Sequence, residues 1–147
     1  RTISYIKTIF ARDTSFYYSV LSWMGITYCF TKTDAVFVWT MGGYQVGRSR
    51  DYYPVFIKIK KEDKKIFDYY AAKLGLNINK RKEVFYKPEY LETFPVEFCD
   101  NIPVDTLQET IDFMKEYVYN FEPALEMVQK IHNVKLGVKY EETATNV

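Results

Sequence analysis

The sequence predicts an α+β fold, in which a small antiparallel sheet of four to five strands packs against amphipathic helices in a single layered domain. Its 147 residues are close to the commonest length of one domain. A content of 48% hydrophobic and 27% charged residues is typical of a globular chain. Stretches with helical spacing alternate with stretches rich in β-branched and aromatic residues, without an internal repeat. We expect residues 1–140 to form this domain and residues 141–147 to form a flexible C-terminal tail.

Two helices are predicted at the start of the chain. Residues 3–10 place apolar side chains at helical spacing. A second helix begins at Asp13 or Thr14, because either side chain suits the N-cap position. Gly25 supplies the end of this second helix.

Three strands are predicted next. Residues 26–31 and 35–40 are rich in β-branched and aromatic side chains, and the short link at 32–34 suits a hairpin between them. After a glycine-containing connection, a third strand is predicted over residues 53–59, with Tyr53, Val55, Ile57 and Ile59 along one side. Pro54 indicates either the beginning of this strand or an edge position.

An amphipathic helix is predicted over residues 62–74. Acidic side chains occupy its first turn and Gly75 follows its last turn, as is common at the two ends of a helix. Two short strands are then expected near residues 84–86 and 96–99, separated by a loop at 88–95.

The last predicted element is a long helical region. Asp105 and Gln108 resemble the ends of a capping box, with Asp in place of the usual Ser or Thr. Pro123 should kink the helix or start a new one, and residues 134–140 are expected to add an edge strand. An apolar seam repeats every four and then three residues, and it either covers the sheet or forms a dimer interface. The seam consists of Leu107, Ile111, Met114, Val118, Phe121, Leu125 and Val128.

The two cysteines, Cys29 and Cys99, lie far apart and neither belongs to a C-x-x-C pair. This spacing excludes a zinc site made of cysteines alone. We expect Cys29, which lies in an alternating apolar run, to act as a small buried hydrophobic residue. A disulfide between the two cysteines stays open and would need an oxidising compartment, but no export signal or membrane-spanning stretch is visible.

The predicted order of helix, hairpin, helix, hairpin and closing helices resembles one half of a LAGLIDADG homing endonuclease. The closest passage runs from Tyr53 to Gly75, where a strand is followed by an amphipathic helix. That family carries a metal-binding acid where its first core helix ends, but residues 22–28 contain no Asp or Glu. The resemblance therefore implies a scaffold of this kind without that family's mechanism of phosphodiester cleavage.

No complete catalytic constellation is present in the sequence. The one histidine, His132, lies near the end of the last helical region, where capping or surface exposure explains it without catalysis. Glu62 and Lys64 form an E-x-K pattern that, with Asp51 upstream, imitates a nuclease metal site. However, acids in the first turn of a helix are favoured by the helix dipole alone. We expect no catalytic residue, no bound metal ion and no cofactor.

The formal charges are strongly separated along the chain. Residues 48–87 carry twelve Lys and Arg against five Asp and Glu, a net charge of +7. Residues 88–147 carry four against twelve, a net charge of −8, although the whole chain is only +1. A basic middle and an acidic end predict two oppositely charged surfaces.

The sequence therefore predicts a non-enzymatic binding protein that contacts the backbone of nucleic acids through a basic surface containing tyrosines. Lysine and arginine bind phosphates without sequence preference, and exposed tyrosines stack on unpaired bases. The predicted contact residues are Tyr44, Arg48, Arg50, Tyr52, Lys58, Lys60, Lys61, Lys64, Lys80, Arg81 and Lys82.

Three alternatives stay open. The lysines on an exposed strand face are also explained by solubility and by protection of a sheet edge. The chain is alternatively a protein-interaction module, an inhibitor or adaptor, that uses its acidic C-terminal helices or its basic face. A third possibility is a degenerate nuclease scaffold of the homing-endonuclease kind. We expect a soluble intracellular protein that does not bind membranes. A homodimer through Leu107, Ile111, Met114 and Val118 stays open as the second use of the apolar seam.

Overall fold

The structure is a computed structural model, and it describes residues 14–45, 47–49 and 51–135. Within these residues, five strands form one sheet in the order β3-β2-β1-β5-β4. The strands are β1 (Tyr28–Phe30), β2 (Tyr52–Lys60), β3 (Glu83–Leu91), β4 (Glu97–Cys99) and β5 (Ile102–Val104). The helix predicted over residues 3–10 and the tail predicted at 141–147 lie outside the described part of the chain.

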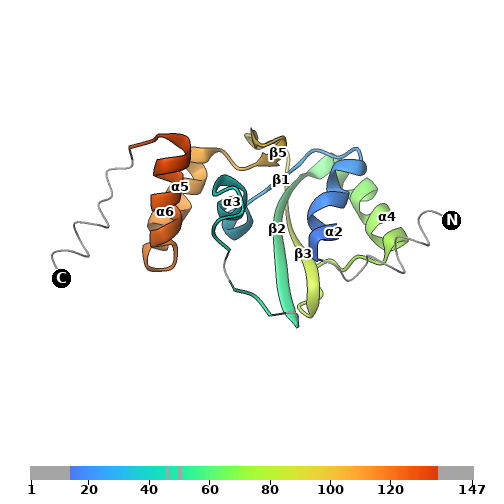
Figure 1. The fold of residues 1–147 in the computed structure, drawn as a ribbon. Coiled ribbons are helices and arrows are strands. Elements are labelled where there is room, and N and C mark those ends of the chain that lie inside the picture. The colour runs from blue at the N-terminus through green and yellow to red at the C-terminus, as the bar shows by residue number, and fades with distance from the viewer. Residues whose placement is uncertain (1–13, 46, 50, 136–147) are drawn as a thin grey trace.

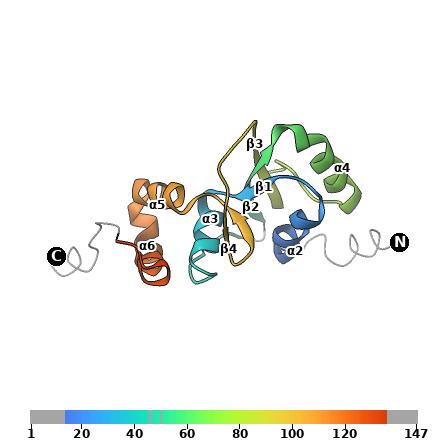
Figure 2. The same ribbon diagram turned by 90° about the horizontal axis from the view of Figure 1, so that it is seen from above.

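The helices lie on both sides of the sheet. They are α2 (Thr14–Ser19), α3 (Lys32–Trp39), α4 (Lys64–Leu74), α5 (Leu107–Glu116) and α6 (Val118–His132), with short 3₁₀ turns η1 (Val20–Trp23) and η2 (Lys61–Asp63). Helices α2 and α4 lie beside β2 and β3 at one end of the molecule, and α3 lies on the other side (Figure 1). Helices α5 and α6 form a further layer beyond α3 (Figure 2).

The predicted α+β class and strand number are confirmed, but the sheet is mixed rather than antiparallel. β1 runs antiparallel to β2 and parallel to β5, and β2 runs parallel to β3 along its whole length. Parallel neighbours need a crossover connection, and α4 supplies it between β2 and β3. The prediction of an antiparallel sheet was wrong because it did not treat α4 as a crossover.

The strand predicted over residues 35–40 is also wrong, because α3 occupies this stretch and the predicted hairpin does not form. Ala35, Val36, Val38 and Trp39 are all buried. A helix that is buried on nearly every side has no polar face, and a short apolar run of this kind looks the same as a buried strand. Without the hairpin, the order of elements that resembled a LAGLIDADG half is absent from the described residues.

β2 and α4 form as the sequence predicts. Val55, Ile57 and Ile59 are fully buried on one side of β2. η2 and α4 cover the predicted helical range, with Phe67 buried against the sheet. The helix ends at Gly75, whose φ of 71° lies in the left-handed region that glycine adopts without strain.

β3 extends through Pro88 into the segment where the sequence predicts a loop. The reason is that β3 lies at an edge of the sheet. The Tyr86 amide points away from β2, since it donates to the Asn77 carbonyl at 2.8 Å. Pro88, two residues later, faces the same outer side, so its missing N–H removes no hydrogen bond to β2.

α5 begins with a capping box that lies one residue later than predicted. The Thr106 hydroxyl accepts the Glu109 N–H at 3.1 Å, and the Glu109 carboxylate accepts from the Thr106 amide in return. Asp105 does not cap the helix and is instead buried. The predicted long helix breaks at Tyr117 rather than at Pro123, so α5 and α6 lie side by side (Figure 1).

The apolar seam of these two helices is used within the chain. Five of its residues are buried, namely Ile111, Met114, Phe121, Leu125 and Val128, and Leu107 and Val118 are partly buried. Ile111 and Met114, two of the four residues considered for a dimer interface, therefore belong to the core. Of the edge strand predicted over residues 134–140, the two described residues are not in a strand.

The capping box gives a test of the fold. Thr106→Ala removes the acceptor for the Glu109 amide, so we expect the free energy of unfolding to fall by about 1 kcal/mol in urea denaturation. Thr93→Ala is the control, because Thr93 is exposed in a loop. Equal stability of the two variants would contradict the cap.

Candidate nucleic-acid interface

The predicted contact residues lie at both ends of β2. The register aligns Tyr52 with Glu83, so the loop with residues 80–82 lies beside the start of β2, as expected. Residues 60–64 lie at the end of the same strand. Since β2 has nine residues, these two groups are roughly 26 Å apart. They do not form one compact cluster.

Arg48 lies in the interior and not on a binding surface. Its side chain is 7% exposed, and its Nη1 lies 3.2 Å from Oδ1 of the fully buried Asp34. The guanidinium lies over the Tyr53 ring at 4.2 Å from the centroid. The Tyr18 hydroxyl donates to the same Asp34 carboxylate at 2.5 Å. Arg48 therefore belongs to a buried polar network, which would have to break before it could meet a phosphate.

The Asp34–Arg48 pair completes the hydrogen bonding of β2. β1 is short and does not cover the first residues of β2. Here the Asp34 carboxylate accepts the Phe56 N–H at 2.7 Å, and Arg48 donates to the Pro54 carbonyl at 2.8 Å. These backbone groups would otherwise lack partners in the interior. The pair thus takes the place that a longer β1 would occupy.

Burial and charge act in opposite directions on this pair. Burial raises the pKa of the Asp34 carboxyl, while the Arg48 charge and the hydrogen bonds from Tyr18 and the Phe56 amide act against this shift. Burial lowers the pKa of Arg48, but the Asp34 charge outweighs it and the pKa is raised. Because arginine keeps its proton, Asp34 is needed as a counter-ion.

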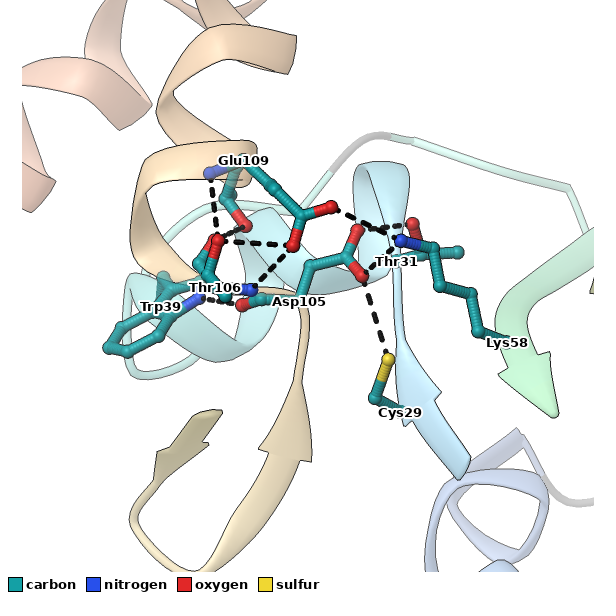
Figure 3. Close-up of polar contacts among 8 residues, drawn as sticks. Cys29, Thr31, Trp39, Lys58, Asp105, Thr106 and Glu109 are labelled. Carbon is teal, nitrogen blue, oxygen red and sulfur yellow. Dashed lines mark hydrogen bonds and ion pairs between the residues drawn. The ribbon is translucent and has the colours of Figure 1, made fainter. Parts of the chain in front are cut away.

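Lys58 is likewise held by carboxylates, as Figure 3 shows. Its side chain is 11% exposed, and its Nζ lies 2.8 Å from Asp105 and 3.4 Å from Glu109. Asp105 also accepts hydrogen bonds from the Thr31 hydroxyl and the Cys29 thiol. Burial lowers the pKa of Lys58, but Asp105 and Glu109 raise it further than burial lowers it. Two acids from the C-terminal half therefore neutralise this predicted contact residue.

The other predicted residues divide into bonded and exposed groups. The Tyr44 hydroxyl donates to the Asn120 carbonyl on α6. Lys60 pairs with Glu62 at 3.2 Å, and Lys64 pairs with Asp68 at 2.7 Å. Arg50 lies outside the described residues. Exposed residues with no ion pair recorded within the described ranges are Tyr52, Lys61, Lys80, Arg81 and Lys82.

The structure adds three residues to this exposed group. Lys65, Tyr69 and Lys73 are exposed and continue from Lys61 in steps of four residues, which places them on one side of the helical run formed by η2 and α4. The signal was present in the sequence, because the predicted helix contained the same spacing. We call Lys61, Lys65, Tyr69 and Lys73 the α4 basic face, and Lys80, Arg81 and Lys82 lie in the loop that follows α4.

The residues that the sequence offered for catalysis make other contacts in the structure. Burial raises the pKa of the Cys29 thiol, and the Asp105 charge acts in the same direction, so this thiol is a poor nucleophile. His132 Nε2 lies 2.6 Å from the Trp39 carbonyl and joins the end of α6 to α3. In the E-x-K pattern, Glu62 is bound by a lysine.

Neither a metal site nor a membrane-spanning helix is found in the described ranges. No group of three or more His, Cys, Asp or Glu side chains there is placed to hold a metal ion. No helix in the same ranges combines the length and the apolar character needed to span a bilayer. No protein-family model, curated protein or solved structure matches the chain.

The buried ion pair predicts a large loss of stability in one arginine variant. We expect Arg48→Met to lower the free energy of unfolding by about 3 kcal/mol, because Asp34 is left buried without its cation. Arg81→Met is the matched control, since Arg81 is exposed and should change stability by less than about 0.5 kcal/mol. Denaturation curves with equal midpoints for the two variants would refute the burial of Arg48.

The thiols provide a second test. Cys29 and Cys99 are free and buried. We expect a thiol reagent such as DTNB to label the native protein at least about tenfold more slowly than the protein in concentrated urea. In a Cys99→Ala variant, labelling of Cys29 at the same rate with and without urea would contradict its burial.

Proposed function

We propose that the protein is a non-enzymatic binding protein that contacts the backbone of nucleic acids through the α4 basic face. The single observation that carries this proposal is the spacing of Lys61, Lys65, Tyr69 and Lys73, which share one exposed helix side. Lys80, Arg81 and Lys82 extend the same charge into the loop between α4 and β3. Cations arranged along a helix suit a ligand whose charges repeat at regular intervals, as phosphates do.

The aromatic side chain on this face suits the same ligand. Tyr69 is an exposed large aromatic residue, and Lys73 Nζ lies 5.5 Å from the centre of its ring. A base that stacks on Tyr69 would place its phosphate within reach of the neighbouring lysines. Single-stranded nucleic acid, whose bases are unpaired, is therefore the favoured ligand.

The distribution of acidic residues supports binding of an anionic ligand at the α4 end of the molecule. Helices α5 and α6 carry Glu109, Asp112, Glu116, Glu122 and Glu126, and they lie at the opposite end of the molecule from α4 (Figure 1). At the near end, Glu62 and Asp68 are paired with lysines. The resulting dipole favours approach of an anionic ligand with α4 first. Two free thiols fit our proposal that the protein works inside the cell.

A protein-interaction module is the second candidate, and a different observation favours it. Trp23 is 85% exposed, and Phe98 is also largely exposed. Large exposed aromatic residues are enriched where proteins bind one another. Ile111 and Met114 are buried within the chain, whereas Trp23 and Phe98 are accessible to a partner.

The nucleic-acid proposal predicts a change in both affinity and salt dependence. We expect the triple variant Lys61→Gln, Lys65→Gln and Lys73→Gln to bind a labelled single strand at least about tenfold more weakly at ~100 mM salt. The slope of log affinity against log salt should fall by about one for each lysine that contacts a phosphate. Fluorescence anisotropy between ~50 and ~200 mM salt measures both quantities.

The control removes cations from the other end of the molecule. Lys115→Gln with Lys130→Gln changes α5 and α6 and should leave affinity within about twofold of the unmodified protein. Equal weakening by both variants would show that net charge alone drives binding. An absence of binding by the unmodified protein would remove this function and favour the interaction module.

A further inference from the structure

A groove of about 440 Å³ lies between α3, the segment after it, and the junction of α5 and α6. This volume lies in the range of small-molecule sites in proteins. Helices α5 and α6 lie away from α4, so the groove is separate from the α4 basic face (Figure 2). It therefore calls for an explanation that does not depend on the proposed function.

Aromatic side chains line much of the groove. They are Tyr44, Phe113, Tyr117 and Phe121. Tyr44 lies 5.9 Å from Phe121, Phe121 lies 5.3 Å from Phe113, and Phe113 lies 5.1 Å from Tyr117, measured between ring centres. The four rings thus form one continuous wall. The Tyr44 hydroxyl donates to the Asn120 carbonyl, which joins the segment after α3 to α6.

The polar groups of the groove are neutral and partly unused. The Thr33 hydroxyl is buried and has no hydrogen-bond partner among the described residues. Gln45 donates through Nε2 to the Tyr53 hydroxyl at 2.6 Å, which leaves its amide oxygen facing no recorded partner in the described ranges. Asn120 adds a second side-chain amide to the lining. A buried hydroxyl without a partner carries a desolvation cost that a bound molecule can offset.

The absence of charged side chains among the described lining residues indicates an uncharged ligand. None of the described residues that line the groove carries a formal charge. Arg48 follows Gly47 of the lining, but its guanidinium is bound to Asp34 and the Pro54 carbonyl. A phosphate or carboxylate would find no free cation among the described residues of the lining. A planar, uncharged molecule can stack on the aromatic wall and use the hydroxyl and amide groups.

We propose that this groove binds a neutral planar heteroaromatic molecule of the nucleobase or nucleoside class. The amides of asparagine and glutamine match the paired donor and acceptor edge of a purine. The aromatic wall supplies the stacking surface, with Tyr117 at the junction of the two helices. Rotation of the Thr33 side chain about χ1 would bring its hydroxyl, which is buried in the free protein, to the ligand.

Adenosine and adenosine 5′-monophosphate are the probes that test this proposal. In heteronuclear NMR titrations of the full chain, we expect adenosine to shift the amide signals around Tyr117 and Asn120 in a saturable way. The monophosphate should bind at least about threefold more weakly, because its charge meets no cation. No saturable shift up to ~5 mM adenosine, or tighter binding of the monophosphate, would overturn the proposal.

Two neighbouring tyrosines provide matched variants. Tyr117 lines the groove and is 46% exposed, whereas Tyr119 is 95% exposed and does not line it. Tyr117→Ala should weaken adenosine binding by at least about tenfold, the size of one lost stacking contact, and Tyr119→Ala should not change it. Equal effects of the two variants would place the ligand elsewhere and overturn the proposal.

Thr33→Val provides a second test that remains valid if the Tyr117→Ala variant does not fold. It removes a buried hydroxyl that has no partner, so the free protein should be as stable as before or more stable. Adenosine binding should nevertheless fall several-fold, because the ligand loses a hydrogen bond. Unchanged binding would overturn the role of Thr33. The lysine variants of the α4 basic face should bind adenosine normally, so this site and the proposed function fail separately.

Discussion

The buried pair of Asp34 and Arg48 is the interaction on which the centre of the fold depends. β2 is the longest strand that has neighbours on both sides, yet β1 covers only part of it. A carboxylate and a guanidinium replace the missing strand for the Pro54 carbonyl and the Phe56 amide. α3 starts directly after β1, so the chain leaves the sheet as a helix at this point. Asp34, in the first turn of this helix, still accepts the hydrogen bond from the Phe56 amide of β2. The pair thereby connects β2 to α3 and to the segment that enters β2.

The same chemistry divides the basic residues into two groups. Arg48 and Lys58 lie next to the sheet, where desolvation makes an unpaired charge costly, and each has a carboxylate partner. The cations of the α4 basic face are exposed to solvent and need no such partner. The separation of charge along the sequence is therefore partly cancelled in space at the centre of the molecule. It persists at the two ends, where α4 is basic and the layer of α5 and α6 is acidic.

Local signals account for the elements that the sequence predicted correctly. The alternation in β2 and the glycine after α4 depend on neighbours within the same segment, so they could be recognised without tertiary information. The partners of Arg48 and Lys58 lie far away in the sequence, and their pairing depends on where α3 and α5 pack. Helix α3 was also missed because of its tertiary surroundings. It is packed on nearly all sides, so its sequence has no polar face by which a helix is recognised. The four-residue spacing of the lysines and the tyrosine of α4 is visible in the sequence. It is hard to distinguish there from the many other cations of the same region.

The outer edge of β3 has a consequence for the behaviour of the protein at high concentration. A long strand at the side of a sheet normally offers its unpaired backbone to other molecules and promotes aggregation. Here the segment around Ile78 already bonds to Tyr86, and Pro88 has no N–H to offer. Addition of a further strand along residues 84–88 is therefore hindered both by the existing hydrogen bonds of Tyr86 and by the proline.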